Sequence, residues 1–198
     1  MGNTTNKNEN LETNLNEVLL EKYRKTTNLS DEEIRCEHER FHELAENGRL
    51  KKIYIEELLG DHIPGNKWKH IKYLIDCIFV AADTNKDGSI DFLEYLMTRR
   101  FFQSSSAEEK AEFIFRIIDH NDDKIVSRKE LEKMLECLED FHRRSTNRVV
   151  HRLIENGVRP TANFIFEKLD EDKSGLVDRT EFIDGWLKDE TIRELFTF

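Results

Sequence analysis

Three segments of twelve residues, each with oxygen-bearing side chains at alternating positions, constrain this chain more than any other feature. They run over 83–94, 119–130 and 170–181, and each begins with Asp and ends with Glu. Four apolar residues precede every segment at offsets of eight, five, four and one, which places them on one face of a helix. The pattern predicts three helices that end where an acidic segment begins. Their apolar residues are Ile75, Ile78, Phe79 and Ala82, then Ala111, Ile114, Phe115 and Ile118, and then Ala162, Ile165, Phe166 and Leu169.

The three segments match the calcium loop of the EF-hand, D-x-[DN]-x-[DNS]-G-x5-E. Calcium takes about seven oxygen ligands at roughly 2.3–2.6 Å, so side chains must converge from alternate positions while the chain turns sharply. Positions 9 and 12 also form an N-cap and N3 pair for the outgoing helix, and an apolar position 8 suits loops that pair through a short strand. The candidate ligands are Asp83, Asn85, Asp87, Ser89, Asp91 and Glu94; Asp119, Asn121, Asp123, Ile125, Ser127 and Glu130; and Asp170, Asp172, Ser174, Leu176, Asp178 and Glu181.

The middle segment departs from the pattern at its sixth position, where Lys124 replaces the usual Gly. This position needs a positive φ, and a residue other than Gly pays roughly 1–2 kcal/mol to adopt it. The middle segment also offers three acidic ligands, whereas each of the other two offers four. We therefore expect three Ca²⁺ sites, of which 119–130 is the weakest, with Mg²⁺ as a candidate occupant at rest.

A fourth unit of the same kind is predicted around Gly48, because EF-hands work in pairs. When Gly48 takes position 6, position 8 is the apolar Leu50, but position 9 is Lys51 and position 12 is Tyr54. Neither of the last two side chains can hold calcium. We expect this first hand to keep the fold and to bind no ion.

Four hands define the expected architecture: an all-α protein of the calmodulin-like superfamily, with two paired lobes. An Asn-rich N-terminal arm covers 1–16 and is expected to be flexible. The N-terminal lobe spans 17–102 and holds hand 1 (silent) and hand 2, a hinge spans 103–106, and the C-terminal lobe spans 107–198 and holds hands 3 and 4. Capping boxes are expected at Ser30 with Glu33 and at Ser106 with Glu109.

Composition narrows the classes of function. The formal net charge of −10 argues against a general nucleic-acid binder. The three cysteines lack a CxxC spacing and fit reduced thiols, and no apolar stretch reaches the roughly 18 residues of a membrane span. A cytoplasmic protein is expected. No nucleophile elbow or phosphate-cradling glycine loop suggests catalysis, and His38, His42, His62 and His70 are interpreted as surface or interface residues.

Beyond the loops, the chain resembles the neuronal calcium sensor family, which includes recoverin and the guanylate-cyclase-activating proteins. The resemblance covers nearly the whole chain and departs from the family at Ala45-Glu46, where a Cys-Pro is usual, and at Glu37-His38, where a Trp-Tyr pair is usual. It rests on the segments Met1-Gly2-Asn3, Thr27-Asn28-Leu29-Ser30-Asp31-Glu32-Glu33-Ile34, Asn47-Gly48-Arg49-Leu50, Glu181-Phe182-Ile183-Asp184-Gly185 and Asp189-Glu190-Thr191-Ile192.

The resemblance implies a sensor that exposes an apolar groove on binding Ca²⁺ and takes up an amphipathic helix of a target protein. It also implies N-myristoylation of Gly2, although position 6 is Asn6 rather than Ser or Thr, with reversible contact with a membrane. Two alternatives remain open, a cytosolic Ca²⁺ buffer and a regulatory phosphatase subunit resembling calcineurin B; an enzyme is not expected. The candidate groove residues are Phe41, Ile55, Leu58, Trp68, Ile71, Phe79, Tyr95 and Leu96.

Overall fold

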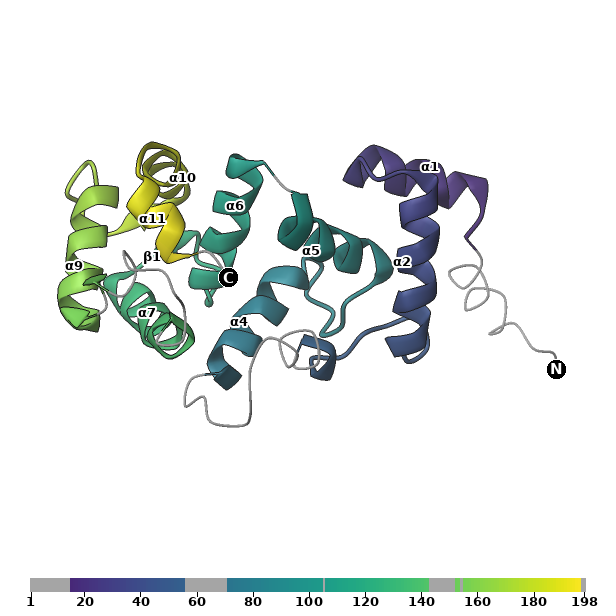
Figure 1. Ribbon diagram of the computed structural model, residues 1–198, viewed down its shortest axis with the longest axis horizontal. Coiled ribbons are helices and arrows are strands. Elements are labelled where there is room, and N and C mark those ends of the chain that lie inside the picture. The colour runs from purple at the N-terminus through teal and green to yellow at the C-terminus, as the bar shows by residue number, and fades with distance from the viewer. Residues whose placement is uncertain (1–14, 56–70, 105, 143–151, 154, 197–198) are drawn as a thin grey trace. The chain divides into compact units, whose positions relative to one another are not determined.

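The computed structural model describes residues 15–55, 71–104, 106–142, 152–153 and 155–196 (Figure 1). Within these residues the secondary structure is helical apart from two strands of two residues each, which confirms the expected all-α class. The elements are α1 (Glu17–Thr27), α2 (Asp31–Leu44), α4 (Ile71–Ala82), α5 (Phe92–Ser104), α6 (Ala107–Ile118), β1 (Ile125–Val126), α7 (Arg128–His142), α9 (Val158–Leu169), β2 (Val177–Asp178), α10 (Arg179–Lys188) and α11 (Glu190–Leu195).

The helices begin where side chains cap them. Ser30 and Glu33 form the expected capping box at the start of α2, and Ser106 and Glu109 form the one at the start of α6. In each box the serine accepts a hydrogen bond from the glutamate N–H, and the glutamate side chain accepts one from the serine N–H. Two backbone donors that a helix start would leave unpaired are thereby satisfied.

The described residues group into two compact units, which lie within 1–63 and 82–104 and within 64–81 and 105–198. Helix α4 therefore belongs to the second unit, although the loop that follows it belongs to the first. Helix α5 continues through Gln103 and Ser104 before the chain enters the second unit.

Helices α1, α2 and α5 pack on one another in the first unit. An aromatic cluster lies between them: the ring of Phe92 meets those of Tyr23 and Phe41 at centroid distances of 5.1 and 5.2 Å. Leu50 and Ile55 are fully buried in the same unit. This core holds the first hand against the outgoing helix of the second.

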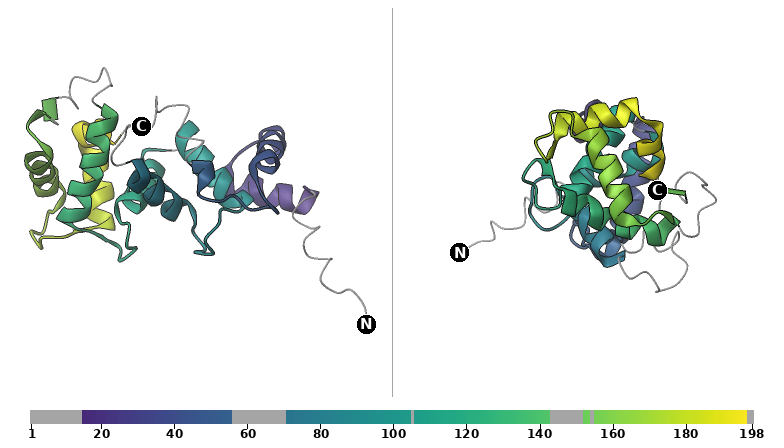
Figure 2. Two further views of the ribbon diagram at one scale, coloured as in Figure 1. Left: turned by 90° about the horizontal axis from the view of Figure 1, so that it is seen from below. Right: turned by 90° about the vertical axis from the view of Figure 1, so that its left-hand side faces the viewer.

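In the second unit α7 lies against α9, and α10 lies against α6 and α11 (Figure 2). Phe115 and Phe182 are buried between these helices, and their ring centroids are 5.7 Å apart. Phe196, just beyond α11, packs on Trp186 of α10 at 5.9 Å. The C-terminal segment is thus part of this unit's own core.

The apolar residues that precede the three acidic segments face the interior, as the offsets predict. All of the twelve are buried except Phe79, which is half-buried. Each incoming helix therefore fixes the first residue of its loop by burying the turn directly before it.

Candidate metal centres

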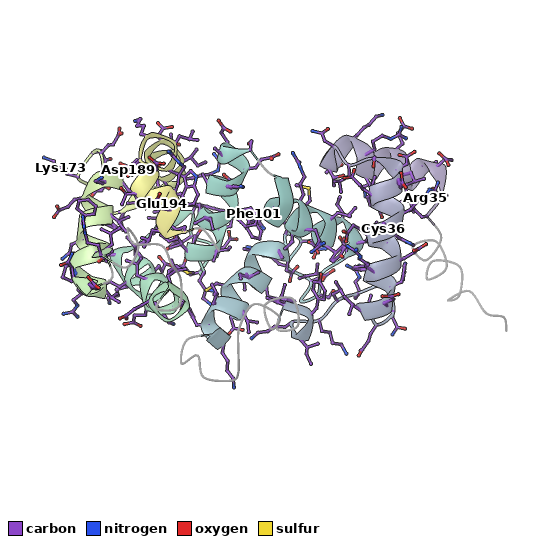
Figure 3. The ribbon with its side chains drawn as sticks, in the orientation of Figure 1. Arg35, Cys36, Phe101, Lys173, Asp189 and Glu194 are labelled. Carbon is purple, nitrogen blue, oxygen red and sulfur yellow. The ribbon has the colours of Figure 1, made fainter. Side chains whose placement is uncertain are left out.

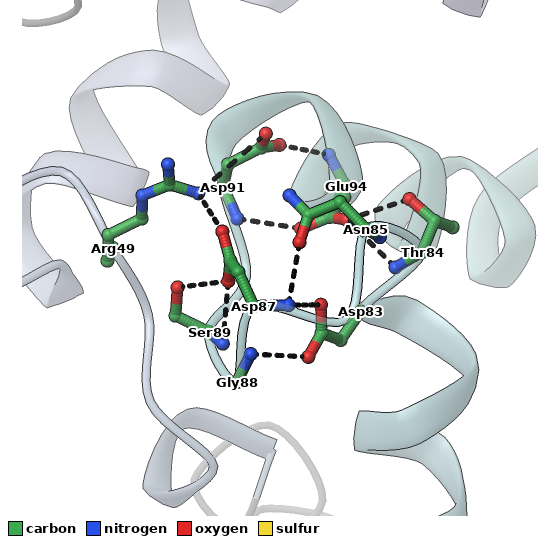
Figure 4. A network of polar contacts seen from close by, with 9 residues as sticks. All are labelled: Arg49, Asp83, Thr84, Asn85, Asp87, Gly88, Ser89, Asp91 and Glu94. Atoms are coloured by element: carbon green, nitrogen blue, oxygen red, sulfur yellow. Dashed lines mark hydrogen bonds and ion pairs between the residues drawn. The ribbon is translucent and has the colours of Figure 1, made fainter.

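The three loops share one hydrogen-bond pattern around the carboxylate at position 1, shown for the first loop in Figure 4. The position 6 N–H donates to one oxygen of this carboxylate, and the position 5 N–H donates to the other. These bonds fold each loop around its first candidate ligand. The position 6 bonds are Gly88 to Asp83 at 2.9 Å, Lys124 to Asp119 at 3.0 Å and Gly175 to Asp170 at 3.0 Å.

The Glu at position 12 is fixed by the helix that it begins. Glu94 Oε2 accepts the Asp91 N–H at 3.0 Å, while the Glu94 N–H donates to Asp91 Oδ1 at 2.9 Å. The pairs at the other two loops make the same reciprocal bonds, so the predicted N-cap and N3 pairing of positions 9 and 12 is confirmed. Each closing carboxylate is therefore held beside the position 9 residue of its own loop.

Three carboxylate oxygens of the third loop are close enough together to bind one Ca²⁺ ion. Asp170, Asp172 and Glu181 each offer one oxygen, and these three oxygens lie within 4.8 Å of one another. Ligands on opposite sides of a Ca²⁺ ion are at most about 5 Å apart, because each lies at roughly 2.5 Å from it. The backbone N–H of Ser174 lowers the pKa of Asp172, which keeps this ligand charged. The donor set fits Ca²⁺.

The first two loops hold their position 1 carboxylates in a drier environment. Asp83 and Asp119 are buried, whereas Asp170 is half-buried. Burial raises the pKa of Asp119 above its usual value, since desolvation disfavours the charged form. A divalent cation would offset this cost by supplying the opposite charge.

The backbone at position 6 is left-handed in all three loops. The φ angles are 82° at Gly88, 70° at Lys124 and 84° at Gly175. The predicted strain at Lys124 is therefore present, and the Lys124 ammonium is paired with the carboxylate of Asp122.

The silent hand keeps its pairing with the second hand. Leu50 and Ile90, both at position 8, exchange backbone hydrogen bonds of 2.9 Å in each direction. Val126 and Val177 pair in the same antiparallel manner between β1 and β2. Tyr54 occupies position 12 as a buried side chain in ring contact with Tyr95. Loop pairing therefore persists where ligands are lost.

Arg49 of the silent hand reaches into the calcium loop of the second hand (Figure 4). Its Nη1 lies 3.0 Å from Asp87 Oδ2 and 3.9 Å from Asp91 Oδ2. Asp87 Oδ1 already accepts hydrogen bonds from the N–H and hydroxyl of Ser89, at 2.9 and 2.6 Å. Both oxygens of this candidate ligand are thus engaged, one of them by a cation.

Arg49→Gln is therefore expected to tighten Ca²⁺ binding at 83–94 by about two- to fivefold, because it removes a competing charge from Asp87. The gain is small since both partners are partly exposed and screened by water. Calorimetric Ca²⁺ titration would measure it. Arg35→Gln, which removes an equal charge exposed on α2 (Figure 3), is the control. Equal affinities in both variants would contradict the competition.

Four of the eight candidate groove residues are core residues in this conformation. Phe41, Ile55, Tyr95 and Leu96 are buried in the first unit, and Phe41 contacts Tyr95 at a centroid distance of 5.4 Å. Phe79 is half-buried on α4 of the second unit. Leu58, Trp68 and the side chain of Ile71 lie outside the described residues.

A buried carboxylate, Glu37, was not predicted. Its Oε2 accepts the Tyr95 hydroxyl at 2.6 Å, and its Oε1 lies 3.3 Å from Arg99 and 3.1 Å from Arg40. Burial raises the pKa of Tyr95, which keeps its hydroxyl protonated as a donor. The signal was present in the sequence: Glu37 lies three residues after Ile34 and four before Phe41, on the apolar face of α2.

His38 and His42 form a second unpredicted feature. They stand in the order His38-Glu39-Arg40-Phe41-His42, which is an HExxH spacing. Their Nε2 atoms are 3.0 Å apart, and both side chains are half-buried. Their half-buried state is compatible with the interpretation as surface or interface residues, but the contact between them was not predicted, although a helix places residues i and i+4 side by side.

The EF-hand domain pair model matches residues 72–136 and 108–187 of the chain. This protein belongs to the EF-hand family. EF-hand domains bind Ca²⁺, and the matched ranges include all three acidic segments. No helix among the described residues is long and apolar enough to cross a membrane.

Three known EF-hand proteins show which members of this large family the chain is similar to. Over 118 residues the chain is 30% identical to a guanylyl cyclase inhibitory protein of Lithobates pipiens, a match that covers 60% of this chain and 56% of that protein. It is 23% identical to visinin of Gallus gallus, over 93% of this chain and 94% of visinin. It is 26% identical to guanylyl cyclase-activating protein 3 of Homo sapiens, over 61% of this chain and 54% of that protein. The chain therefore spans about half the length of the two cyclase-related proteins. The predicted resemblance to the neuronal calcium sensors is confirmed.

Proposed function

We propose that this sensor binds Ca²⁺ at 83–94, 119–130 and 170–181 and thereby regulates a target protein. The observation that supports it is the hydrogen-bond pattern shared by the three loops, in which positions 5 and 6 hold the first carboxylate and position 9 holds the last. The pairing of position 8 residues links the loops two by two, so an ion in one loop acts on its neighbour. Mg²⁺ is a candidate occupant of the same loops at rest.

The output that we propose is exposure of an apolar groove, as in other sensor EF-hand proteins. The aromatic residues Phe41, Phe92 and Tyr95 are buried in the conformation described here. If the helices of this unit moved apart, these residues would be exposed and would supply the apolar surface of the groove. An amphipathic helix of a target would bind such a groove through its apolar face. Two relatives carry names that refer to guanylyl cyclase, so we propose a cyclase of this class as the target.

We also propose a cellular location for this protein and an organisation of its chain into lobes. We propose a cytoplasmic protein with lobes at 17–102 and 107–198, a hinge at 103–106 and a flexible arm at 1–16. A myristoyl group on Gly2 would give reversible membrane contact, since one such chain binds membranes only marginally. Gly2 lies outside the described residues.

The decisive experiment measures the fluorescence of a hydrophobic dye as Ca²⁺ is added to the full chain. We expect a several-fold increase for the unaltered protein and a much smaller one for the variant Glu94→Gln/Glu130→Gln/Glu181→Gln, which loses the closing ligand of every loop. Glu190→Gln in α11 is the control for removing a carboxylate outside the loops. Binding of Ca²⁺ with unchanged dye fluorescence would instead identify a buffer, because buffer EF-hands barely open.

A further inference from the structure

We propose that His38 and His42 on α2 form a chelating site for a divalent transition-metal ion, such as Ni²⁺, Cu²⁺ or Zn²⁺, that is separate from the calcium loops. The two residues are one helical turn apart, so their imidazole rings leave the same face of the helix. Imidazole nitrogen suits these metals, whereas Ca²⁺ requires oxygen ligands. The site would therefore respond to a different class of ion.

The distance between the two ring nitrogens fits a shared metal ion. Nε2 of His38 and Nε2 of His42 are 3.0 Å apart. Two imidazole nitrogens that each lie at about 2.1 Å from one ion, at right angles, are separated by about 3.0 Å. Such neighbouring positions occur in the square-planar and octahedral sites that Cu²⁺ and Ni²⁺ favour. A tetrahedral ion would need the nitrogens to move apart by only a few tenths of an ångström.

Both rings are supported by aromatic neighbours in the first unit. The His38 ring meets Phe92 edge-on at a centroid distance of 4.9 Å, and the His42 ring meets Phe41 at 5.6 Å. The capping box of Ser30 and Glu33 fixes the start of the helix that carries them. Restricting the rings in this way reduces the side-chain entropy that a metal ion would have to remove.

The pair supplies two ligands and leaves the other coordination positions open. Among the residues that the structure describes, no third His, Cys, Asp or Glu ligand atom groups with these nitrogens within 4.8 Å. A catalytic zinc site needs three protein ligands, whereas the described residues supply two here. Water, or a side chain of a bound target, would complete the shell.

The test is a calorimetric titration of the full chain with Ni²⁺ in the presence of saturating Ca²⁺. Cys36 is an exposed thiol on the same helix (Figure 3), so Cys36→Ser serves as the background for every protein in the series. We expect one Ni²⁺ site that His42→Gln weakens roughly tenfold or more, because a second ligand held on the same scaffold greatly raises affinity. Ca²⁺ binding should not change.

A register variant provides the matched control. His42→Gln/Glu43→His keeps the number of histidines but places the second one five residues after His38, out of line with it. It should bind Ni²⁺ as weakly as His42→Gln does. Affinities that remain at the starting value in both variants would overturn the proposal and would leave the pair as a simple hydrogen bond.

A second measurement needs no substitution at the pair, in case its loss loosens the core around Phe41. Trace Cu²⁺ should selectively broaden the proton NMR signals of the His38 and His42 rings in the Ca²⁺-loaded protein, before those of His120 or other histidines. If Cu²⁺ broadened the signals of other histidines but not those of His38 and His42, the proposed site would also be rejected.

Discussion

Replacing Glu37 with Ala is expected to lower the free energy of unfolding of the first unit by about 2–4 kcal/mol. Its side chain is only 9% exposed and joins α2 to α5 through the Tyr95 hydroxyl and the Arg99 guanidinium. Without the carboxylate, Arg99 keeps its charge with 22% of its side chain exposed, and the Tyr95 hydroxyl loses its acceptor. Removing one partner of a buried charge pair costs more than the pair itself contributes, because the other charge stays desolvated.

Chemical denaturation followed by circular dichroism would measure this loss. Glu39→Ala, two residues away and exposed on the same helix, should cost less than about 0.5 kcal/mol and is the matched control. Adding Arg99→Ala to Glu37→Ala should cost little more than Glu37→Ala alone, because the partner charge is then gone. Strictly additive losses in this double-mutant cycle would contradict the coupling.

The same carboxylate would alter the surface of the apolar groove proposed above. Where the family has a Trp-Tyr pair, this chain has Glu37 and His38, and Glu37 brings Arg40 and Arg99 with it. An opened groove would therefore contain a polar network between apolar walls formed by residues such as Phe41. A target helix that fits it needs a polar residue facing α2, since an apolar one would leave buried charges unpaired.

Features set by short-range rules could be predicted from the sequence. The acidic loops, the buried faces of their incoming helices and the capping boxes all depend on residues a few positions apart, where helix geometry fixes which side chains meet. The pairing of Leu50 with Ile90 was also predictable, because it follows from the position of each residue in its own loop. These local rules hold whatever surrounds them.

Features that depend on distant residues were not predictable. Glu37 meets Tyr95 and Arg99 across separations of 58 and 62 residues, and Arg49 meets Asp87 across 38. The sequence places Glu37 on the apolar face of α2, but it does not identify the distant partners of Glu37 or of Arg49. Only the packing of α2 on α5 and the pairing of the first two hands bring the partners together. The His38 and His42 pair is different: its spacing is local, and it could have been predicted.

Lys124→Gly is expected to gain about 1 kcal/mol in the third hand. This gain is divided between the free energy of Ca²⁺ binding at 119–130 and the free energy of unfolding of the second unit. Lys124 has a φ of 70°, which costs a residue with a β-carbon roughly 1–2 kcal/mol, and the added chain entropy of Gly offsets part of the gain. At the equivalent Gly88 and Gly175 an added β-carbon would meet nothing within 4 Å. The cost of Lys at this position is therefore conformational, without a steric clash, which explains why the loop tolerates it.

Two variants distinguish the effect of backbone strain at Lys124 from the effect of its positive charge. Lys124→Ala removes the ammonium that pairs with Asp122 but keeps the β-carbon, whereas Lys124→Gly removes both. If backbone strain limits the loop, only Lys124→Gly should show tighter Ca²⁺ binding by calorimetry, by up to about fivefold, or a higher melting temperature without Ca²⁺. An equal gain in Lys124→Ala would assign the weakness to the positive charge near the ion. Affinity and melting temperature unchanged in both variants would show that neither property of Lys124 weakens the middle site.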